Sequence, residues 1–170
     1  MYIHPSCAIH YGQEGCPLKI KKLLICLGLP LAVGGLSTLL SGGMDSYSKL
    51  VRPPLSPPGW LFPIVWTILF LLMGYASYRV LTADAPKEQK QRALLFYGLQ
   101  LAVNFLWSPV FFGLEWLVVA FVILVALWAL IFITSNLFNQ IDKRSSTLLL
   151  PYLLWVTFAG YLNFAFILLN

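Results

Sequence analysis

Long apolar runs separated by short polar connectors dominate the sequence. A helix that crosses the hydrocarbon core of a bilayer, about 30 Å thick, needs about 20 mainly apolar residues. The run from Ala93 to Ile141 contains one charged residue, Glu115, and is too long for one crossing at about 1.5 Å per residue. We therefore divide it at Gly113–Glu115. The predicted spans are Leu23–Leu40, Trp60–Leu81, 93–112, 116–138 and Thr147–Leu169.

The fold class follows from the type of periodicity. No run alternates with a period of two over about ten residues, as the strands of a transmembrane β-barrel do. Helices satisfy every backbone hydrogen bond within the segment, which lipid demands. We predict an all-α, polytopic membrane protein, a bundle of five transmembrane helices. Residues 1–22 would form an N-terminal tail and residues 23–170 the transmembrane domain.

The amino-acid composition is that of a membrane protein. Of the 170 residues, 59% are hydrophobic and 10% are charged, against about 45–50% and about 25% in an ordinary soluble domain. The mean hydropathy is +0.81. One small core cannot bury so many apolar side chains, which excludes a soluble globular protein. The high hydrophobicity excludes a disordered chain.

The basic residues give an orientation. Five crossings put the termini on opposite sides, and nine of the 11 Lys and Arg then fall on the N-terminal side. Lys49 and Arg52 fall on the other side. The positive-inside rule predicts a cytoplasmic N-terminus in a bacterial plasma membrane, with a mitochondrial outer membrane as the alternative. The net charge is +5, but the basic residues lie between the apolar runs rather than in one patch, so we expect no nucleic-acid partner.

Ionisable side chains are missing from the middle of every predicted span. Such residues normally mark proton relays and ion paths, so this pattern disfavours a proton-coupled pump, a voltage sensor or a charged ion channel. It also excludes general acid–base catalysis within the bilayer. In the tail, His4, Cys7, His10 and Cys16 could approach a metal ion, but their spacing matches no zinc pattern and we assign no metal site.

Three predicted spans carry a large aromatic ring on one helical face. These rings are Trp66 in the second span, Trp107 in the third and Trp155 in the fifth, and two of the faces add an amide, Asn104 and Asn163. Packed together, the faces could line an apolar slot with a few polar groups, which suits a flat, hydrophobic ligand. Helix–helix packing explains the same spacing, so both interpretations stay open.

Several segments resemble the TspO/MBR family, which comprises the tryptophan-rich sensory proteins or translocator proteins. They are Tyr47–Phe70, with its Ser-Pro-Pro-Gly-Trp motif, Met73–Tyr78, Asn104–Gly113, Leu150–Trp155 and Phe158–Asn163. The resemblance covers residues 23–169. The chain departs from the family at Leu55, where Trp is frequent, and at its C-terminal end, which lacks the basic residue of the sterol motif in animal members.

The resemblance implies a five-helix bundle, often a homodimer, that binds tetrapyrroles such as protoporphyrin IX and heme. It implies no required cofactor; the porphyrin or heme is the ligand, and membrane lipid is the other partner. Some bacterial members are reported to degrade porphyrin in light, which would give Trp66 and Trp155 a photochemical role. Carried over by motif, the ligand cavity would include Tyr47, Pro57, Trp66, Asn104, Trp107, Tyr152, Trp155 and Ala159.

Three functions fit this picture. The first is binding and sensing of porphyrins, with or without light-dependent degradation. The second is transport of porphyrins, lipids or sterols across the membrane, and the third is a structural or regulatory role with a vestigial pocket. Transporters are often built from paired repeats with discontinuous helices, and five spans do not divide into equal halves. We therefore favour binding.

Overall fold

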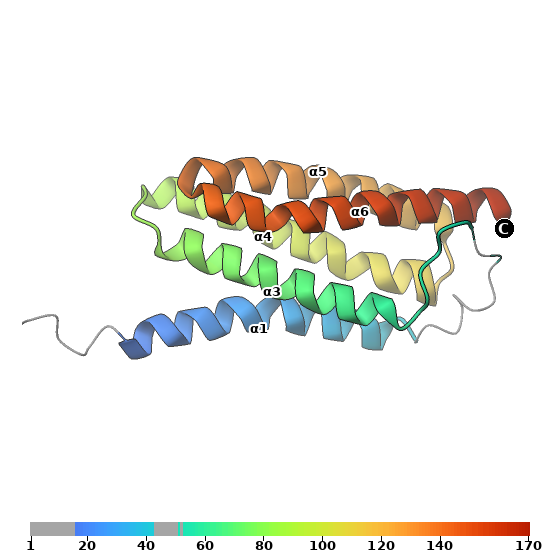
Figure 1. Cartoon of the computed structure of the whole chain (residues 1–170), viewed down its shortest axis with the longest axis horizontal. Coiled ribbons are helices and arrows are strands. Elements are labelled where there is room, and N and C mark those ends of the chain that lie inside the picture. The colour runs from blue at the N-terminus through green and yellow to red at the C-terminus, as the bar shows by residue number, and fades with distance from the viewer. Residues whose placement is uncertain (1–15, 43–50, 52) are drawn as a thin grey trace, which may run out of the picture.

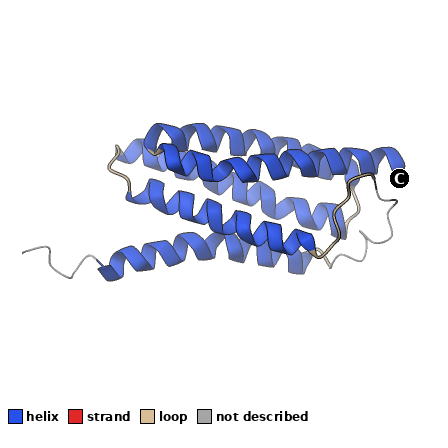
Figure 2. Cartoon of the chain, viewed as in Figure 1, coloured by secondary structure: helices blue, strands red, loops and turns tan. Residues whose placement is uncertain are grey.

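In a computed structural model of the chain, residues 16–42, 51 and 53–170 are described, and every regular element among them is helical (Figure 2). Five helices are long and apolar enough to cross a membrane, which confirms the predicted all-α polytopic fold. A short π-helix, η1, continues α4. The elements are α1 (Cys16–Leu40), α3 (Leu61–Thr82), α4 (Lys87–Ser108), η1 (Pro109–Gly113), α5 (Leu117–Ile141) and α6 (Lys143–Leu169).

Each predicted span corresponds to one long helix, and the predicted break at Gly113–Glu115 separates η1 from α5. The helices extend past the apolar runs at their charged ends. Thus α1 begins at Cys16 rather than Leu23, and residues 16–22 are helical. Lysine is a good helix former, and its long side chain carries the charge away from the apolar segment. The lysines at positions 19, 21 and 22 are accordingly exposed.

The five long helices run alternately in opposite directions (Figure 1). α3 packs between α1 and α6, α4 packs against α1 and α5, and α5 and α6 close the bundle. The start of α1 and the C-terminus lie at opposite ends of the molecule (Figure 1). The chain segments before and after α3 therefore lie at opposite ends of the bundle. The segment that leads into α3 lies at the same end as the C-terminus (Figure 1).

Two glycines allow α1 and α3 to approach closely. A Cβ atom added at Gly74 would lie 2.6 Å from the carbonyl oxygen of Cys26, and one added at Gly34 would overlap the ring of Phe70. Pro30 follows Cys26 by four residues and offers no N–H to that carbonyl. The close contact between α1 and α3 thus depends on the absence of a side chain at Gly34 on α1 and at Gly74 on α3.

Asp142 links α3 to α6 at the end of the bundle where the C-terminus of α3 lies. Arg79 donates from Nε to Oδ2 of Asp142 at 2.7 Å and from Nη2 to Oδ1 at 3.1 Å. The same carboxylate caps α6 by accepting from the backbone N–H and the hydroxyl of Ser145. The Arg79 guanidinium, together with Ser145, holds the pKa of Asp142 well below its usual value. One side chain therefore ties α3 to the α5–α6 junction, and the cap explains why α6 begins at Lys143 rather than Thr147.

The described part of the first loop is tied to α6. The side chain of Asn170 accepts a hydrogen bond from the N–H of Val51 at 3.0 Å and donates to its carbonyl at 3.3 Å. The hydroxyl of Tyr161 donates to the carbonyl of Pro54 at 3.3 Å. The loop passes beside the end of α6 before it enters α3 (Figure 1).

Candidate functional site

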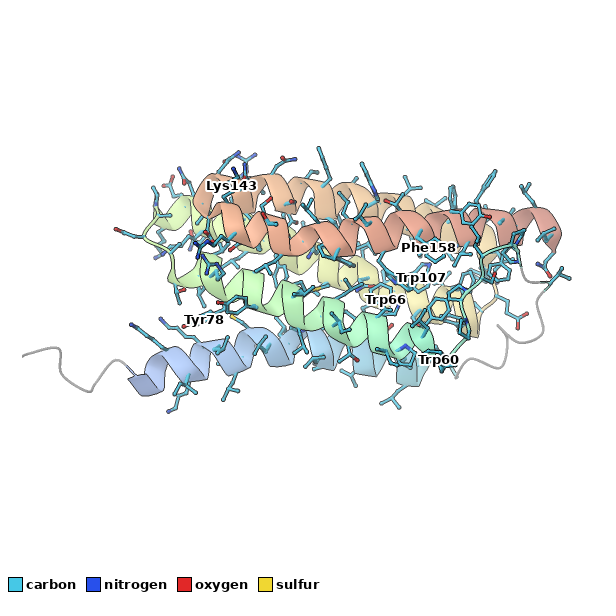
Figure 3. All side chains as sticks on the ribbon, in the orientation of Figure 1. Trp60, Trp66, Tyr78, Trp107, Lys143 and Phe158 are labelled. Atoms are coloured by element: carbon cyan, nitrogen blue, oxygen red, sulfur yellow. The ribbon has the colours of Figure 1, made fainter. Side chains whose placement is uncertain are left out.

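Trp66 is the centre of an aromatic cluster that joins three helices. Its ring centroid lies 6.1 Å from that of Trp107 on α4 and 6.1 Å from that of Tyr152 on α6. Phe70, one turn further along α3, lies 5.5 Å from it. Trp107 and Tyr152 are buried and Trp66 is half-buried. Figure 3 shows Trp66 and Trp107 in the half of the bundle near the first loop.

Trp155 joins this cluster through Phe62. The centroids of the two rings are 5.9 Å apart in an edge-to-face arrangement, and the ring of Phe158 lies 5.6 Å from that of Trp155. Ala159 is buried one turn further along α6, and Pro57 is buried in the first loop. The faces of α3, α4 and α6 singled out by the aromatic spacing therefore meet inside the bundle.

A cavity of about 150 Å³ opens beside Trp66, between α1, α3 and α4. Trp66, Asn104 and Trp107 are the sequence-predicted residues that line it. Tyr152 and Trp155, both on α6, are not part of its lining. The lining consists of Val33, Gly34, Ser37, Thr38, Ser41, Phe62, Pro63, Trp66, Phe70, Asn104, Phe105, Trp107, Ser108 and Phe112.

A second space lies on the α6 side of Trp107, and Ala159 lines it together with Asn163. Its volume is about 10 Å³, which is the least that one water molecule requires. The Asn163 amide, oriented so that both of its groups are satisfied, donates to the carbonyl of Leu117 at 2.9 Å and accepts from the N–H of Phe121 at 3.3 Å. Asn163 therefore joins α6 to α5, and the usable free space lies on the α1 side.

The wall contributed by α1 is small and polar, and the aromatic spacing gave no indication of it. The Ser37 hydroxyl donates to the carbonyl of Phe105 at 2.7 Å, and the hydroxyls of Ser41 and Ser108 are 2.7 Å apart. The signal in the sequence is the set of small residues at positions 34, 37, 38 and 41, which share one helical face. Small residues at such spacing are typical of close helix–helix contacts in membranes.

Several buried polar atoms have no hydrogen-bond partner within the described part of the chain. Leaving such an atom unpaired costs about 1–3 kcal/mol, so native proteins usually satisfy it with a partner or a water molecule. Tyr97 and Gln100 belong to this set although the aromatic spacing did not single them out; they precede Asn104 on the same face of α4. The atoms are Tyr97 Oη, Gln100 Nε2 and Oε1, Asn104 Nδ2, Trp107 Nε1, Tyr152 Oη and Trp155 Nε1.

Tyr47, which the resemblance predicts in the ligand cavity, lies outside the described part of the chain. So do His4, Cys7, His10 and the side chain of Cys16, to which the sequence assigned no metal site. Among the residues that the structure describes, no three His, Cys, Asp or Glu side chains gather as metal ligands would.

Five apolar crossings around an aromatic, uncharged interior define a multi-pass integral membrane protein. None of the buried side chains among the described residues is charged. The sequence pattern of the TspO/MBR family matches residues 25–169. The chain belongs to this family of membrane sensory and translocator proteins, as its sequence motifs indicate.

Individual relatives agree with this assignment. The chain is similar to the tryptophan-rich protein TspO of Chlorobaculum tepidum, with 42% identity over 154 residues that cover 89% of this chain and 98% of that protein. It is 41% identical to the tryptophan-rich sensory protein of Cereibacter sphaeroides over 124 residues, 73% of this chain and 76% of the relative. It is 34% identical to the translocator protein of Bos taurus over 123 residues, 72% of this chain and 73% of the relative.

Proposed function

We propose that this membrane protein binds a porphyrin-type tetrapyrrole, such as protoporphyrin IX or heme, against Trp66 within the bundle and serves as its sensor. The observation that carries the proposal is the aromatic cluster of Trp66, Trp107 and Tyr152 at the edge of a cavity. A flat apolar macrocycle stacks on indole rings. The unpartnered N–H groups of Asn104 and Trp107 would donate to acceptor atoms on the ligand.

The proposed ligand needs more room than the cavity offers. Sites for drug-sized ligands occupy about 300–1,000 Å³, whereas the free space beside Trp66 is about 150 Å³. We place the additional room at α1, which has the smallest buried share of the five spans. Outward movement of α1 would exchange the Ser37–Phe105 and Ser41–Ser108 hydrogen bonds for contacts with the ligand.

The same arrangement supports light-dependent degradation of the porphyrin. A photoexcited porphyrin passes its energy to dioxygen, and an electron-rich indole next to it is readily oxidised. Trp66 borders the cavity, and Trp155 lies behind Phe62, in edge-to-face contact with it. We propose these two tryptophans as the photochemical residues, Trp66 being the nearer to the ligand.

Binding is tested by titrating the purified protein with protoporphyrin IX in the dark and following the quenching of tryptophan fluorescence. We expect micromolar affinity, and about tenfold weaker binding, or about 1.4 kcal/mol, in Asn104→Ala and in Trp107→Ala. Trp128→Phe is the matched control, because Trp128 lies on the outer surface between α5 and α6. Unchanged affinity in both cavity variants would show that the site lies elsewhere.

Degradation is tested by the loss of porphyrin absorbance under illumination. The double variant Trp66→Phe/Trp155→Phe should lose this reaction and still bind porphyrin, whereas Trp128→Phe should keep it. A double variant that degrades porphyrin at the parent rate would refute the photochemical role. Transport is distinguished by sealed proteoliposomes, into which a transporter would move porphyrin faster than it enters protein-free vesicles.

A further inference from the structure

An open groove of about 410 Å³ lies between α3 and α6 at the end of the bundle where α1 begins. Tyr75 and Arg79 form its α3 side, and Arg144, Thr147 and Leu148 form its α6 side. The cavity beside Trp66 has none of these residues in its lining and lies toward the opposite end of α3. The groove is therefore a separate site with its own chemistry.

Arg79 borders the groove with its guanidinium already fixed. Nε and Nη2 donate to the carboxylate of Asp142, which leaves the N–H groups of Nη1 as donors on the remaining edge. The ring of Tyr75 lies 6.0 Å from the guanidinium carbon, within cation–π range. The Arg79 side chain stays 27% exposed. A guanidinium held in place loses little entropy on binding, and its planar fork matches phosphate oxygens.

Arg144 supplies the net charge of the groove. Asp142 compensates Arg79, whereas Arg144 is exposed and has no ion pair within the described part of the chain. Lys143 adds a further positive charge next to it. Nine of the 11 Lys and Arg of the chain belong to this end of the bundle. The groove therefore favours an anion and repels a cationic group.

The surface beyond the charged mouth is apolar. Leu148 forms part of the groove, and Leu71 and Ile68, one and two turns before Tyr75 on the same face of α3, are exposed. In a chain that spans a bilayer, such side chains face hydrocarbon. A ligand that fits both parts has an anionic head and an apolar tail.

We propose that this groove binds an anionic phospholipid, with its phosphate held between Arg79 and Arg144 and an acyl chain lying past Leu148. Basic pockets between transmembrane helices are established receptors for anionic headgroups. A zwitterionic lipid such as phosphatidylcholine carries an ammonium group that Arg144 repels. A soluble phosphate ester would leave the apolar part of the groove without a partner.

The test offers equal amounts of phosphatidylglycerol and phosphatidylcholine to the detergent-purified chain and counts retained lipids by native mass spectrometry. We expect a preference for phosphatidylglycerol that falls about fivefold in Arg144→Gln, or about 1 kcal/mol for a basic residue that contacts the phosphate, and clearly less in Lys143→Gln. Lys143→Gln is the matched control, because it removes the same charge from the neighbouring residue, which does not line the groove. Phosphatidylglycerol should also raise the melting temperature of the parent more than that of Arg144→Gln.

Thr147→Glu is a second variant with an independent expectation. The Thr147 hydroxyl bonds within its own helix, to the carbonyl of Lys143 at 3.1 Å, and the residue is exposed, so the fold should tolerate the change. The new carboxylate should abolish the preference for phosphatidylglycerol, and retention of the preference would overturn the proposal. Equal losses in Arg144→Gln and Lys143→Gln would overturn it in favour of general surface charge. Displacement of the lipid by millimolar inorganic phosphate at constant ionic strength, or by a sterol, would overturn it in favour of a soluble-anion or a sterol site.

Discussion

The hydroxyl of Ser37 on α1 donates to the carbonyl of Phe105 on α4 across 2.7 Å. In a regular α-helix that carbonyl would accept from the N–H four residues further on, but that residue is Pro109, which has none. Ser37 of α1 therefore supplies the hydrogen-bond donor that Pro109 of the neighbouring helix cannot offer to the Phe105 carbonyl. This hydrogen bond lies in the wall of the cavity beside Trp66.

Ser37→Ala should lower the free energy of unfolding by about 1 kcal/mol, because the Phe105 carbonyl loses its donor in a part-buried position. Pro109→Ala would supply an N–H to the same carbonyl, so Ser37→Ala should cost less in that background. A double-mutant cycle measured by denaturation in detergent should give a coupling of about 0.5–1 kcal/mol. Thr38→Ala is the control, because the Thr38 hydroxyl bonds to Gly34 of its own helix. Additive effects of the two changes would contradict the pairing.

Gly74→Ala should destabilise the protein by about 1–3 kcal/mol, because its Cβ would meet the backbone of α1, 2.6 Å from the carbonyl oxygen of Cys26. Gly98→Ala on α4 is the matched control, since a Cβ there meets nothing within 4 Å. Alanine is also the better helix former, so the control should be neutral or more stable by up to about 1 kcal/mol. Melting temperatures in one detergent compare the two variants, and equal shifts would rule out the close approach of α1 and α3.

The spans and the break before Glu115 were predictable because both depend on local composition. A run of about 20 apolar residues identifies a crossing wherever its neighbours lie. The starts of α1 and α6 were not predictable from apolar runs, since the exposed lysines of α1 and the Asp142 cap of α6 extend the helices into polar sequence.

The candidate site was predictable in part for a related reason. Helical spacing showed which residues share a face, and Trp66, Trp107 and Tyr152 do meet. Spacing carries no information on which helices become neighbours. The cavity opens toward α1, whose Ser37 and Ser41 carry no ring and so gave no aromatic signal. The order of helices around the bundle is a property of tertiary packing, and so is the Arg79–Asp142 pair, whose members are 63 positions apart.

The free energy of unfolding should fall at acidic pH because the ionised carboxylate of Asp142 stabilises the folded protein. Its pKa is lowered in the folded protein, chiefly by Arg79, relative to the ordinary 3.8. A lowered pKa contributes stability that is complete above about pH 5 and is lost as the pH falls below about 4. Asp142→Asn should cost about 1 kcal/mol near neutral pH through loss of the ion pair, because asparagine caps a helix about as well as aspartate.

The measurement is the melting temperature between neutral pH and pH 3, in the parent and in Asp142→Asn. The difference between the two should shrink as the pH falls below about 4, because the carboxyl of Asp142 takes up a proton in the unfolded parent before it does so in the folded parent. Asp84→Asn removes a charge from the loop between α3 and α4, at the same end of the bundle, and serves as the control. A difference that stays constant over this range would contradict the ionised carboxylate as the source of the stabilisation.

Filling the cavity from α1 should decide on which side of Trp66 the proposed ligand lies. Val33 is half-buried in the cavity wall, and Val33→Phe would place a ring in the free space that the macrocycle needs. We expect its affinity for protoporphyrin IX to fall at least about tenfold, or about 1.4 kcal/mol. Ala32→Phe adds a ring at an exposed neighbouring position that does not line the cavity, and its affinity should stay at the parent value. Unchanged affinity in Val33→Phe, with an unchanged melting temperature, would move the ligand to the α6 side of the cluster, against Tyr152 and Trp155.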